Sequence, residues 1–453
     1  MTRIGRSALW AYVSLLGGMP LSAALLPLLL WRFSLEQLAV WYLIQNLGQL
    51  TAIAETALEP SLTRYLTYAR GGVARLPGYG EPPETSSGQE NTALVQEVIG
   101  AARWLHRSLS GVNLILFGLG GALLLAHLAA PLGDLTQVLT AWGLYCLAQA
   151  MGTRWMAAIP LLLGSGHGHA AFRAFAIQRL VFGVVAALGL VLAGRLEVLG
   201  LAQLAGVCAG LWPAMWLARR HLPWAAPSLR PALAKTLLRA GAALWLSRLG
   251  GYLVARANLP VLSAALGLGV AGRLALTMQL IDMLINVAQT PMFASLPRLY
   301  ELSAQGAIAR SKAIVGRVFI FGWLSFVSGG IVLWAAGDEL LSLLGKPGVL
   351  LGWAPLGLML VGGLLDLNFS ISATLLMVGN RVPFVFASLV SGLLVVMLNA
   401  LALTLTPAGL MTALSIPLIV QASYNYWKWP LECLRLFQTS YPALLKAAWR
   451  TRS

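Results

Sequence analysis

Apolar stretches of about 20 residues recur along almost the whole chain, and this pattern restricts the possible fold more than any other feature of the sequence. A stretch of that length crosses about 30 Å of hydrocarbon as an α-helix, in which the backbone groups pair within the segment. Hydrophobic residues make up 58% of the 453 residues and charged residues only 10%. The chain is therefore suited to a bilayer rather than to water.

We predict an all-α polytopic membrane protein with about twelve transmembrane helices. The predicted spans cover residues 9–31, 35–58, 109–128, 135–158, 172–193, 198–217, 237–260, 268–292, 318–336, 350–376, 382–405 and 408–427. The first span follows the basic residues Arg3 and Arg6, but it is longer than the core of a signal peptide and precedes no small-residue cleavage site. We expect it to remain in the mature protein.

The basic residues indicate the orientation of the chain, because Lys and Arg near span ends are retained in the cytoplasm. With both termini cytoplasmic, most of the 31 Lys and Arg residues fall on the inner side, and Arg32, Arg195 and Lys346 fall outside. We therefore predict a multi-pass membrane protein with both termini in the cytoplasm. The net charge of +16 reflects this topology, with contact to membrane lipids as a by-product, and does not indicate binding of nucleic acid.

Two glycine pairs occupy corresponding places in the two halves of the chain. Gly17 and Gly18, closely followed by Pro20, interrupt the first predicted span, and Gly250 and Gly251 interrupt the seventh. Interrupted hydrophobic helices in matching positions are typical of transporters, because irregular backbone in a membrane is tolerated only where it lines a cavity. These five residues are candidate hinges. Close packing of helices is the alternative reason for glycine in a span.

A second match at nearly the same spacing supports an internal repeat. Residues 61–64, which close the second span, resemble residues 295–298, which close the eighth. We predict two pseudo-symmetric six-helix bundles around a central cavity, formed by residues 1–226 and 227–453. Because each half has an even number of spans, the two should be related by an axis along the membrane normal.

The longest predicted cytoplasmic segment, at about residues 66–107, has two parts. Residues 71–90 are rich in Gly, Pro, Ser and Glu and indicate a flexible loop. The apolar residues between Leu94 and Leu105 then fall on one face of a helix, which we expect to lie on the membrane surface before the third span. This helix could serve as a partner-binding surface or simply as a connector.

Three arginines lie within predicted spans, where burial of a charge costs about 2.5 to 3.5 kcal/mol and requires a partner, a cavity or a function. They are Arg248, Arg256 and Arg273. Arginine remains charged, and its planar fork of donors binds phosphate oxygens, so the three are candidate substrate-binding residues. The alternative is an internal ion pair, such as Arg248 with Asp282 or Arg273 with Asp366.

Four carboxylates also lie within or at the inner end of predicted spans. Asp282 and Asp366 are candidates to carry a coupling proton or sodium ion, because each lies in the interior of its span. Glu55 and Glu59, one helical turn apart at the inner end of the second span, are candidates for ion coupling or gating, and the alternatives are an anchor at the membrane surface or a contact with substrate.

No catalytic, metal or cofactor site is expected. The longest external connection, at about residues 337–349, contains no histidine and no arrangement for a nucleophile, which disfavours a membrane polysaccharide polymerase or ligase. His167 and His169 have a metal-like spacing, but no further ligand is evident.

Several segments resemble the multidrug/oligosaccharidyl-lipid/polysaccharide (MOP) exporter superfamily, and within it the Wzx-type O-antigen and polysaccharide flippases. Residues 55–65 resemble the ending of the family's second span, with an arginine and an aromatic residue at its close. Residues 272–276 and 295–302 resemble the eighth span and the cytoplasmic turn that follows it. The general similarity covers nearly the whole chain.

This resemblance implies two six-helix lobes around a cationic cavity and an alternating-access mechanism. The cargo would be a polyprenyl-pyrophosphate-linked oligosaccharide, such as an O-antigen, capsule or exopolysaccharide repeat unit, and polysaccharide assembly proteins would be partners. The alternative is a cation-coupled drug or metabolite exporter. The drug-exporting branch usually carries an acidic residue in its first span, and residues 9–31 contain none, which counts against that alternative.

Overall fold

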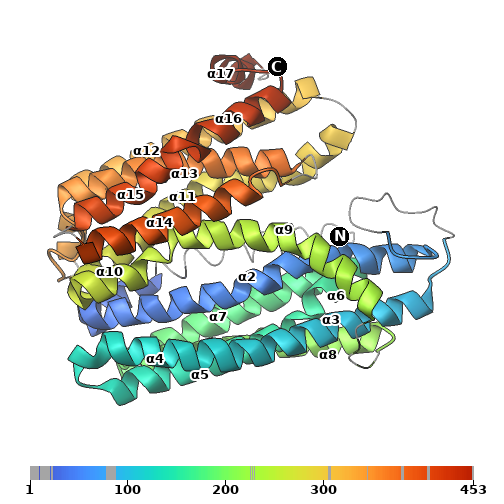
Figure 1. The fold of residues 1–453 in the computed structure, drawn as a ribbon, viewed down its shortest axis with the longest axis horizontal. Helices are drawn as coiled ribbons and strands as arrows, with labels where there is room; N and C mark the ends of the chain where they lie inside the picture. Colours follow the sequence, from blue (N-terminus) through green and yellow to red (C-terminus); the bar gives the residue numbers. More distant parts are fainter. Residues whose placement is uncertain are drawn as a thin grey trace. The chain divides into compact units, whose positions relative to one another are not determined.

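Helices account for nearly all of the described chain, as the hydrophobic pattern predicts (Figure 1). The computed structural model describes residues 10, 21, 24–77, 88–224, 226, 228, 230–304, 308–343, 345–378, 382–405 and 409–450. No β-strand occurs in these ranges. The predicted all-α class is therefore confirmed.

Nine helical segments within the described ranges are long and apolar enough to cross a membrane. They coincide with the third to eleventh predicted spans and are Thr92–Leu132, Leu135–Gly164, Gly168–Leu192, Glu197–His221, Gly241–Leu266, Leu268–Leu296, Ser311–Ser342, Trp353–Met377 and Val385–Thr404. The chain is thus a multi-pass membrane protein. Most of the first predicted span lies outside the described residues, and its last part, residues 24–32, is helical.

The chain divides into two compact units, Met1–Trp245 and Leu246–Ser453. The sequence placed the junction near residue 226, before helix α9 (Pro231–Ala255), whereas the units divide within that helix. Besides the start of α9, the first unit contains α2 (Leu35–Gly71), α3 (Thr92–Val112), η1 (Asn113–Phe117), α4 (Gly118–Ala129), η2 (Ala130–Leu132), α5 (Leu135–Met156), α6 (Ala158–Gly164), α7 (Gly168–Leu192) and α8 (Glu197–His221).

Glycines set the distance between helices in the first unit. A Cβ atom on Gly206 of α8 would lie 2.6 Å from the carbonyl oxygen of Gln178 on α7, and one on Gly210 would lie 2.4 Å from that of Ala174. These distances are too short for any side chain. In a bilayer, apolar burial drives helix association only weakly, so close van der Waals packing must hold the helices together. Small residues permit this close approach.

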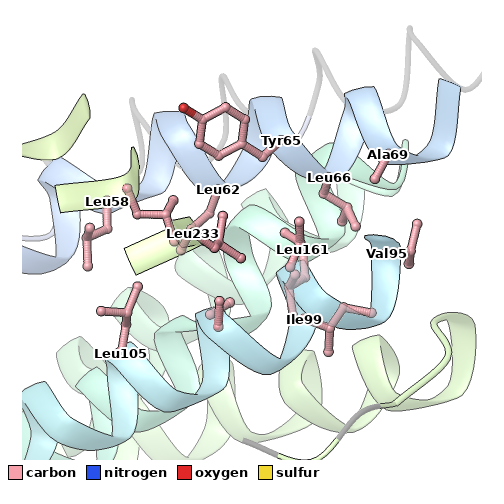
Figure 2. Packing of buried hydrophobic residues seen from close by; sticks show 14 of the residues in the cluster. Leu58, Leu62, Tyr65, Leu66, Ala69, Val95, Ile99, Leu105, Leu161 and Leu233 are labelled. Atoms are coloured by element: carbon pink, nitrogen blue, oxygen red, sulfur yellow. The ribbon is translucent and has the colours of Figure 1, made fainter. Parts of the chain in front are cut away.

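The apolar face of α3 is buried inside the first unit. Val95 and Ile99 are fully buried against Leu62 and Leu66 of α2 and Leu161 of α6 (Figure 2). The prediction that this helix lies on the membrane surface is therefore wrong. Its amphipathic pattern serves a contact with neighbouring helices, which a hydrophobic period alone does not distinguish from a contact with lipid.

In its described residues, the second unit contains the end of α9 and the helices that follow it (Figure 1). These are α10 (Asn258–Leu266), α11 (Leu268–Ala304), α12 (Ile308–Ser342), α13 (Trp353–Met377), α14 (Val385–Leu405), α15 (Leu410–Ser423), α16 (Asn425–Leu436) and α17 (Tyr441–Arg450). The twelfth predicted span is divided at Tyr424, between α15 and α16. The described part of this predicted span, residues 409–427, is therefore not one continuous helix.

The glycine pair of the seventh span does not interrupt its helix, contrary to the prediction. Helix α9 runs through Gly250 and Gly251 and ends at Ala255. A Cβ atom on Gly250 would lie 2.4 Å from the carbonyl carbon of Ser388, so this glycine allows α14 to approach closely. Whether the pair also acts as a hinge remains a prediction. The matching candidates Gly17, Gly18 and Pro20 lie outside the described residues.

Candidate functional site

A cavity of about 150 Å³ lies within the second unit, among the end of α9 and helices α10, α11, α13, α15 and α16. Most of its wall is apolar. Its polar residues are Arg256, Asn258, Asp282, Asp366 and Tyr426. The space is large enough for several water molecules or a hydrated cation, but smaller than the roughly 300 to 1,000 Å³ typical of pockets for drug-sized ligands.

On one side of this cavity the helix is interrupted at Arg256 and Ala257, between α9 and α10. The amide of Arg256 donates to the carbonyl of Tyr252 at 2.7 Å, and that of Ala257 reaches the same oxygen at 3.2 Å. Helix α10 begins immediately afterwards. A break in a membrane-spanning segment leaves backbone carbonyls without helical partners, and this is tolerated where protein or a cavity covers them.

Two asparagines form hydrogen bonds at this interruption of the helix. The side-chain amide of Asn258 lies 3.5 Å from the carbonyl oxygen of Val254, one turn earlier. Its Oδ1 accepts a hydrogen bond of 3.0 Å from Nδ2 of Asn399 on α14, and both asparagines are buried. The helix break is thereby fixed to a neighbouring helix.

Arg256 forms an ion pair with Asp282 on α11. Both side chains are partly buried, with 26% and 38% of their surfaces exposed. In such surroundings two opposite charges attract more strongly than in water. The sequence suggested Arg248 as a partner for Asp282, whereas the ion pair seen at this carboxylate is with Arg256.

Asp366 lies near the middle of α13 and is partly buried. Its Oδ1 accepts a hydrogen bond of 2.7 Å from the Tyr426 hydroxyl on α16. Asp282 lines the same cavity, and two ionised carboxylates in one cavity repel each other. With both carboxylates ionised and Arg256 as the cation, the described lining residues carry one more negative than positive charge. Such a cavity attracts a cation.

The other two arginines predicted to bind substrate lie elsewhere. Arg248 on α9 and Arg273 on α11 are exposed, and neither is among the residues that line the cavity. The structure therefore brings together Arg256, Asp282 and Asp366 but does not add Arg248 or Arg273 to them.

Glu55 lies in a separate polar cluster in the first unit. This buried carboxylate accepts a hydrogen bond from the Thr153 hydroxyl of α5. The side-chain amide of Asn113 in turn donates to the Thr153 oxygen at 3.0 Å. Asn113 begins the π-helical segment η1, and such irregular turns often mark functional positions. Glu59, one turn after Glu55, is partly buried.

Sequence reasoning missed Tyr426, Asn258 and Thr153. Each is an uncharged polar residue in a span, and such residues are too common in membrane helices to indicate a site by themselves. The adjacent break at Tyr424 was not visible in the hydrophobic pattern either.

The sequence has a metal-like spacing at His167 and His169, where we expected no metal site because no further ligand was evident. His167 stacks on His221, with ring centroids 4.5 Å apart. Within the part of the chain that was searched, no group of three or more His, Cys, Asp or Glu residues could hold a metal ion.

No family model matches the chain, and no curated protein matches its sequence. Solved structures do match. The MATE multidrug transporter DinF-BH in complex with R6G has a TM-score of 0.66 at 13% identity, over 98% of this chain and 96% of its own. An inward-facing multidrug-resistance MATE transporter of the MOP superfamily has a TM-score of 0.59 at 14% identity, over the full length of both chains.

The chain has the fold of MATE transporters. A MOP superfamily transporter from Pyrococcus furiosus also matches, with a TM-score of 0.51 at 13% identity over 97% of this chain and 96% of its own. At identities of 13 to 14% these matches show the fold alone, and they do not distinguish the Wzx branch from the drug-exporting branch. The similar structures are transporters rather than enzymes.

Proposed function

We propose that this chain is a cation-coupled exporter of small drug-like molecules or metabolites and that Asp366 carries the coupling cation. The observation that supports this most is the position of Asp366, a carboxylate in the middle of a span whose hydrogen-bond donor is the neutral Tyr426 hydroxyl. An ionised carboxylate at this depth costs about 2.5 to 3.5 kcal/mol. A cation that enters the cavity would remove this cost.

The ion pair beside Asp366 strengthens the attraction for such a cation. Arg256 pairs with Asp282, and the negative charge of Asp282, which lines the same cavity, repels that of an ionised Asp366. A proton on Asp366, or a sodium ion next to it, relieves this repulsion. Arg256 stays charged and cannot itself carry the coupling cation.

Cation binding can be linked to a conformational change through the contact between α13 and α16. When Asp366 is ionised, Tyr426 joins these two helices by a charge-assisted hydrogen bond. Protonation replaces it by a weaker neutral bond. A conformation in which the helices move apart then becomes less costly, and a ligand with different affinity for two conformations shifts their populations.

The cavity is too small for the cargo, so its role in this proposal is coupling. DinF-BH is a multidrug transporter whose structure contains R6G, and a similar small amphipathic compound is our proposed class of substrate. The missing acid in the first span is compatible with this proposal because the coupling carboxylate lies in the second unit.

The experiment uses the full-length protein in proteoliposomes, with R6G as the probe. Its movement is followed under a pH gradient, under a sodium gradient and without a gradient, and empty liposomes are the control. Movement that depends on one of the two gradients would support the proposal and identify the cation. R6G movement at the rate of empty liposomes under both gradients would contradict it.

A second candidate is the flippase for polyprenyl-pyrophosphate-linked oligosaccharides in a bacterial inner membrane. It is favoured by Arg248 and Arg273, whose exposed side chains lie on membrane-spanning helices where they could hold phosphate oxygens. With Arg256, they remain our candidates for binding such a cargo. In this case the polysaccharide assembly proteins of the cell would be partners, and both termini would face the cytoplasm.

Cells that carry Arg248→Gln and Arg273→Gln distinguish the two candidates. A flippase should lose glycan export and accumulate lipid-linked repeat units, while the protein level in the membrane stays unchanged. Unchanged glycan export in the double variant would remove both arginines from a cargo site and leave the exporter as the better account.

A further inference from the structure

A second cavity, of about 110 Å³, lies in the first unit and is lined by arginines and tryptophans. Its polar and aromatic residues are Arg103, Arg107, Arg154, Arg219, Trp155 and Trp224. No carboxylate is found among the described residues that line it. This cavity is distinct from the coupling site proposed above, which belongs to the second unit.

Three helices and the residues that follow α8 bring these side chains together. Arg103 and Arg107 lie one turn apart on α3, Arg154 lies in the last turn of α5, and Arg219 lies in the last turn of α8. The Trp224 ring lies 4.6 Å from the Arg103 guanidinium and 5.3 Å from that of Arg219. The indole therefore holds two of the arginines by cation–π contacts.

Two ordinary effects explain part of this cluster. The carboxyl end of a helix carries partial negative charge and stabilises cations such as Arg154 and Arg219. The retention of basic residues on the cytoplasmic side explains why arginines are frequent at one end of the spans. Neither effect explains why Arg103 and Arg107 converge on the same space.

Arg103, Arg107, Arg154 and Arg219 all line this one small space. Like charges at such short range repel one another. Like charges at i and i+4 on a helix, as in Arg103 and Arg107, also destabilise it. A bound anion would turn these repulsions into attractions, because each guanidinium could then face a shared negative charge.

Phosphate is the anion that fits the donors best. Guanidinium groups bind phosphate oxygens through paired hydrogen bonds, and a cavity of about 110 Å³ has room for a phosphate group with a few water molecules. Trp104 follows Arg103 in the sequence and Trp216 lies one turn before Arg220, and the two are 42% and 49% exposed. Tryptophan is enriched at the level of lipid headgroups, and Arg219 lies near the end of the span Glu197–His221.

We propose that these four arginines form a binding site for the phosphate of an anionic phospholipid headgroup. The lipid joins α3, α5 and α8 at the membrane interface and neutralises the repulsion between the arginines. Basic pockets between membrane helices bind anionic headgroups in this manner. The bound lipid stabilises the first unit and makes its stability depend on the composition of the bilayer.

The test measures binding and thermal unfolding of the full-length protein, stripped of lipid in a neutral detergent. It is titrated separately with phosphatidylglycerol, with zwitterionic phosphatidylcholine and with inorganic phosphate. The variants are Arg107→Gln and Arg219→Gln, singly and together. Arg220→Gln is the matched control, because Arg220 is adjacent on α8 but stacks on Trp216 at 3.4 Å and does not line the cavity.

We expect phosphatidylglycerol to bind the wild type and Arg220→Gln equally and to raise their unfolding temperatures. Each substitution in the cavity should weaken this binding about tenfold, the change expected for loss of a charge-assisted hydrogen bond. Phosphatidylcholine should have little effect. Wild-type binding should also weaken as the salt concentration rises, a measurement that does not depend on any variant.

Two results would overturn this proposal. Equal binding of phosphatidylglycerol to the wild type and the double variant would show that the cluster is not the site. Equally tight, arginine-dependent binding of inorganic phosphate would assign the site to a soluble phosphate compound and overturn the lipid as its ligand.

Discussion

Adjacent glycines on α9 provide a sharp test of how the second unit packs. A Cβ atom added to Gly250 would lie 2.4 Å from the carbonyl carbon of Ser388 and 2.6 Å from the amide nitrogen of Leu389. A Cβ atom added to Gly251 would meet nothing within 4 Å. The two substitutions Gly250→Ala and Gly251→Ala therefore make the same chemical change in two different environments.

The atoms that Gly250→Ala would meet belong to the backbone of α14, so they cannot rotate away. Normal contacts between carbon atoms are about 3.5 to 4.0 Å, so α9 and α14 would have to separate by about 1 Å. Overpacking of this kind costs about 1 to 3 kcal/mol. Alanine also has a higher helix propensity than glycine, which stabilises either variant by about 1 kcal/mol.

Thermal unfolding of the purified protein in detergent measures the difference. In a unit of this size, about 1 kcal/mol corresponds to about 2 to 4 °C. We expect Gly250→Ala to lower the unfolding temperature by several degrees and Gly251→Ala to leave it unchanged or raise it. An unfolding temperature for Gly250→Ala equal to or above that of Gly251→Ala would refute the packing of α9 against α14.

Four further substitutions test three individual hydrogen bonds. Tyr426→Phe should slow gradient-driven transport, because Asp366 loses its donor at 2.7 Å; initial transport rates would show this. Thr153→Val should lower the free energy of unfolding by about 1 to 3 kcal/mol, because Glu55 loses its donor. Addition of Glu55→Gln to this variant should restore part of the lost stability, measured by thermal unfolding. Asn399→Leu should destabilise the protein by a similar amount, because Asn258 loses its buried donor; an unchanged unfolding temperature would contradict that role.

The length and polarity of the spans could be read from the sequence because both are local properties. Nine predicted spans coincide with helices that are suited to a bilayer. The position of the helix break could not be read in this way. The glycine pair is the strongest local signal, yet the break lies at Arg256, where Asn258 contacts Asn399 on a helix far along the chain.

The charged residues of the cavity could be predicted, because Arg256, Asp282 and Asp366 are unusual in membrane spans. Their arrangement could not. The pairing of Arg256 with Asp282, and the contact of Asp366 with Tyr426, depend on how α9, α11, α13 and α16 pack. The apolar face of α3 illustrates the same limit, because its pattern fits lipid and protein neighbours equally well.

The proposed coupling role of Asp366 is tested most directly by comparing two kinds of R6G movement in proteoliposomes. One is accumulation driven by a pH or sodium gradient, and the other is exchange of R6G across the membrane without a gradient. Asp338→Asn is the matched control, because the Asp338 carboxylate accepts a hydrogen bond from the amide of Gly348 and does not line the cavity.

We predict that Asp366→Asn abolishes gradient-driven accumulation but retains exchange, while Asp338→Asn retains both. Gradient-driven accumulation by Asp366→Asn at the wild-type level would contradict the account, since the coupling cation would then be carried elsewhere.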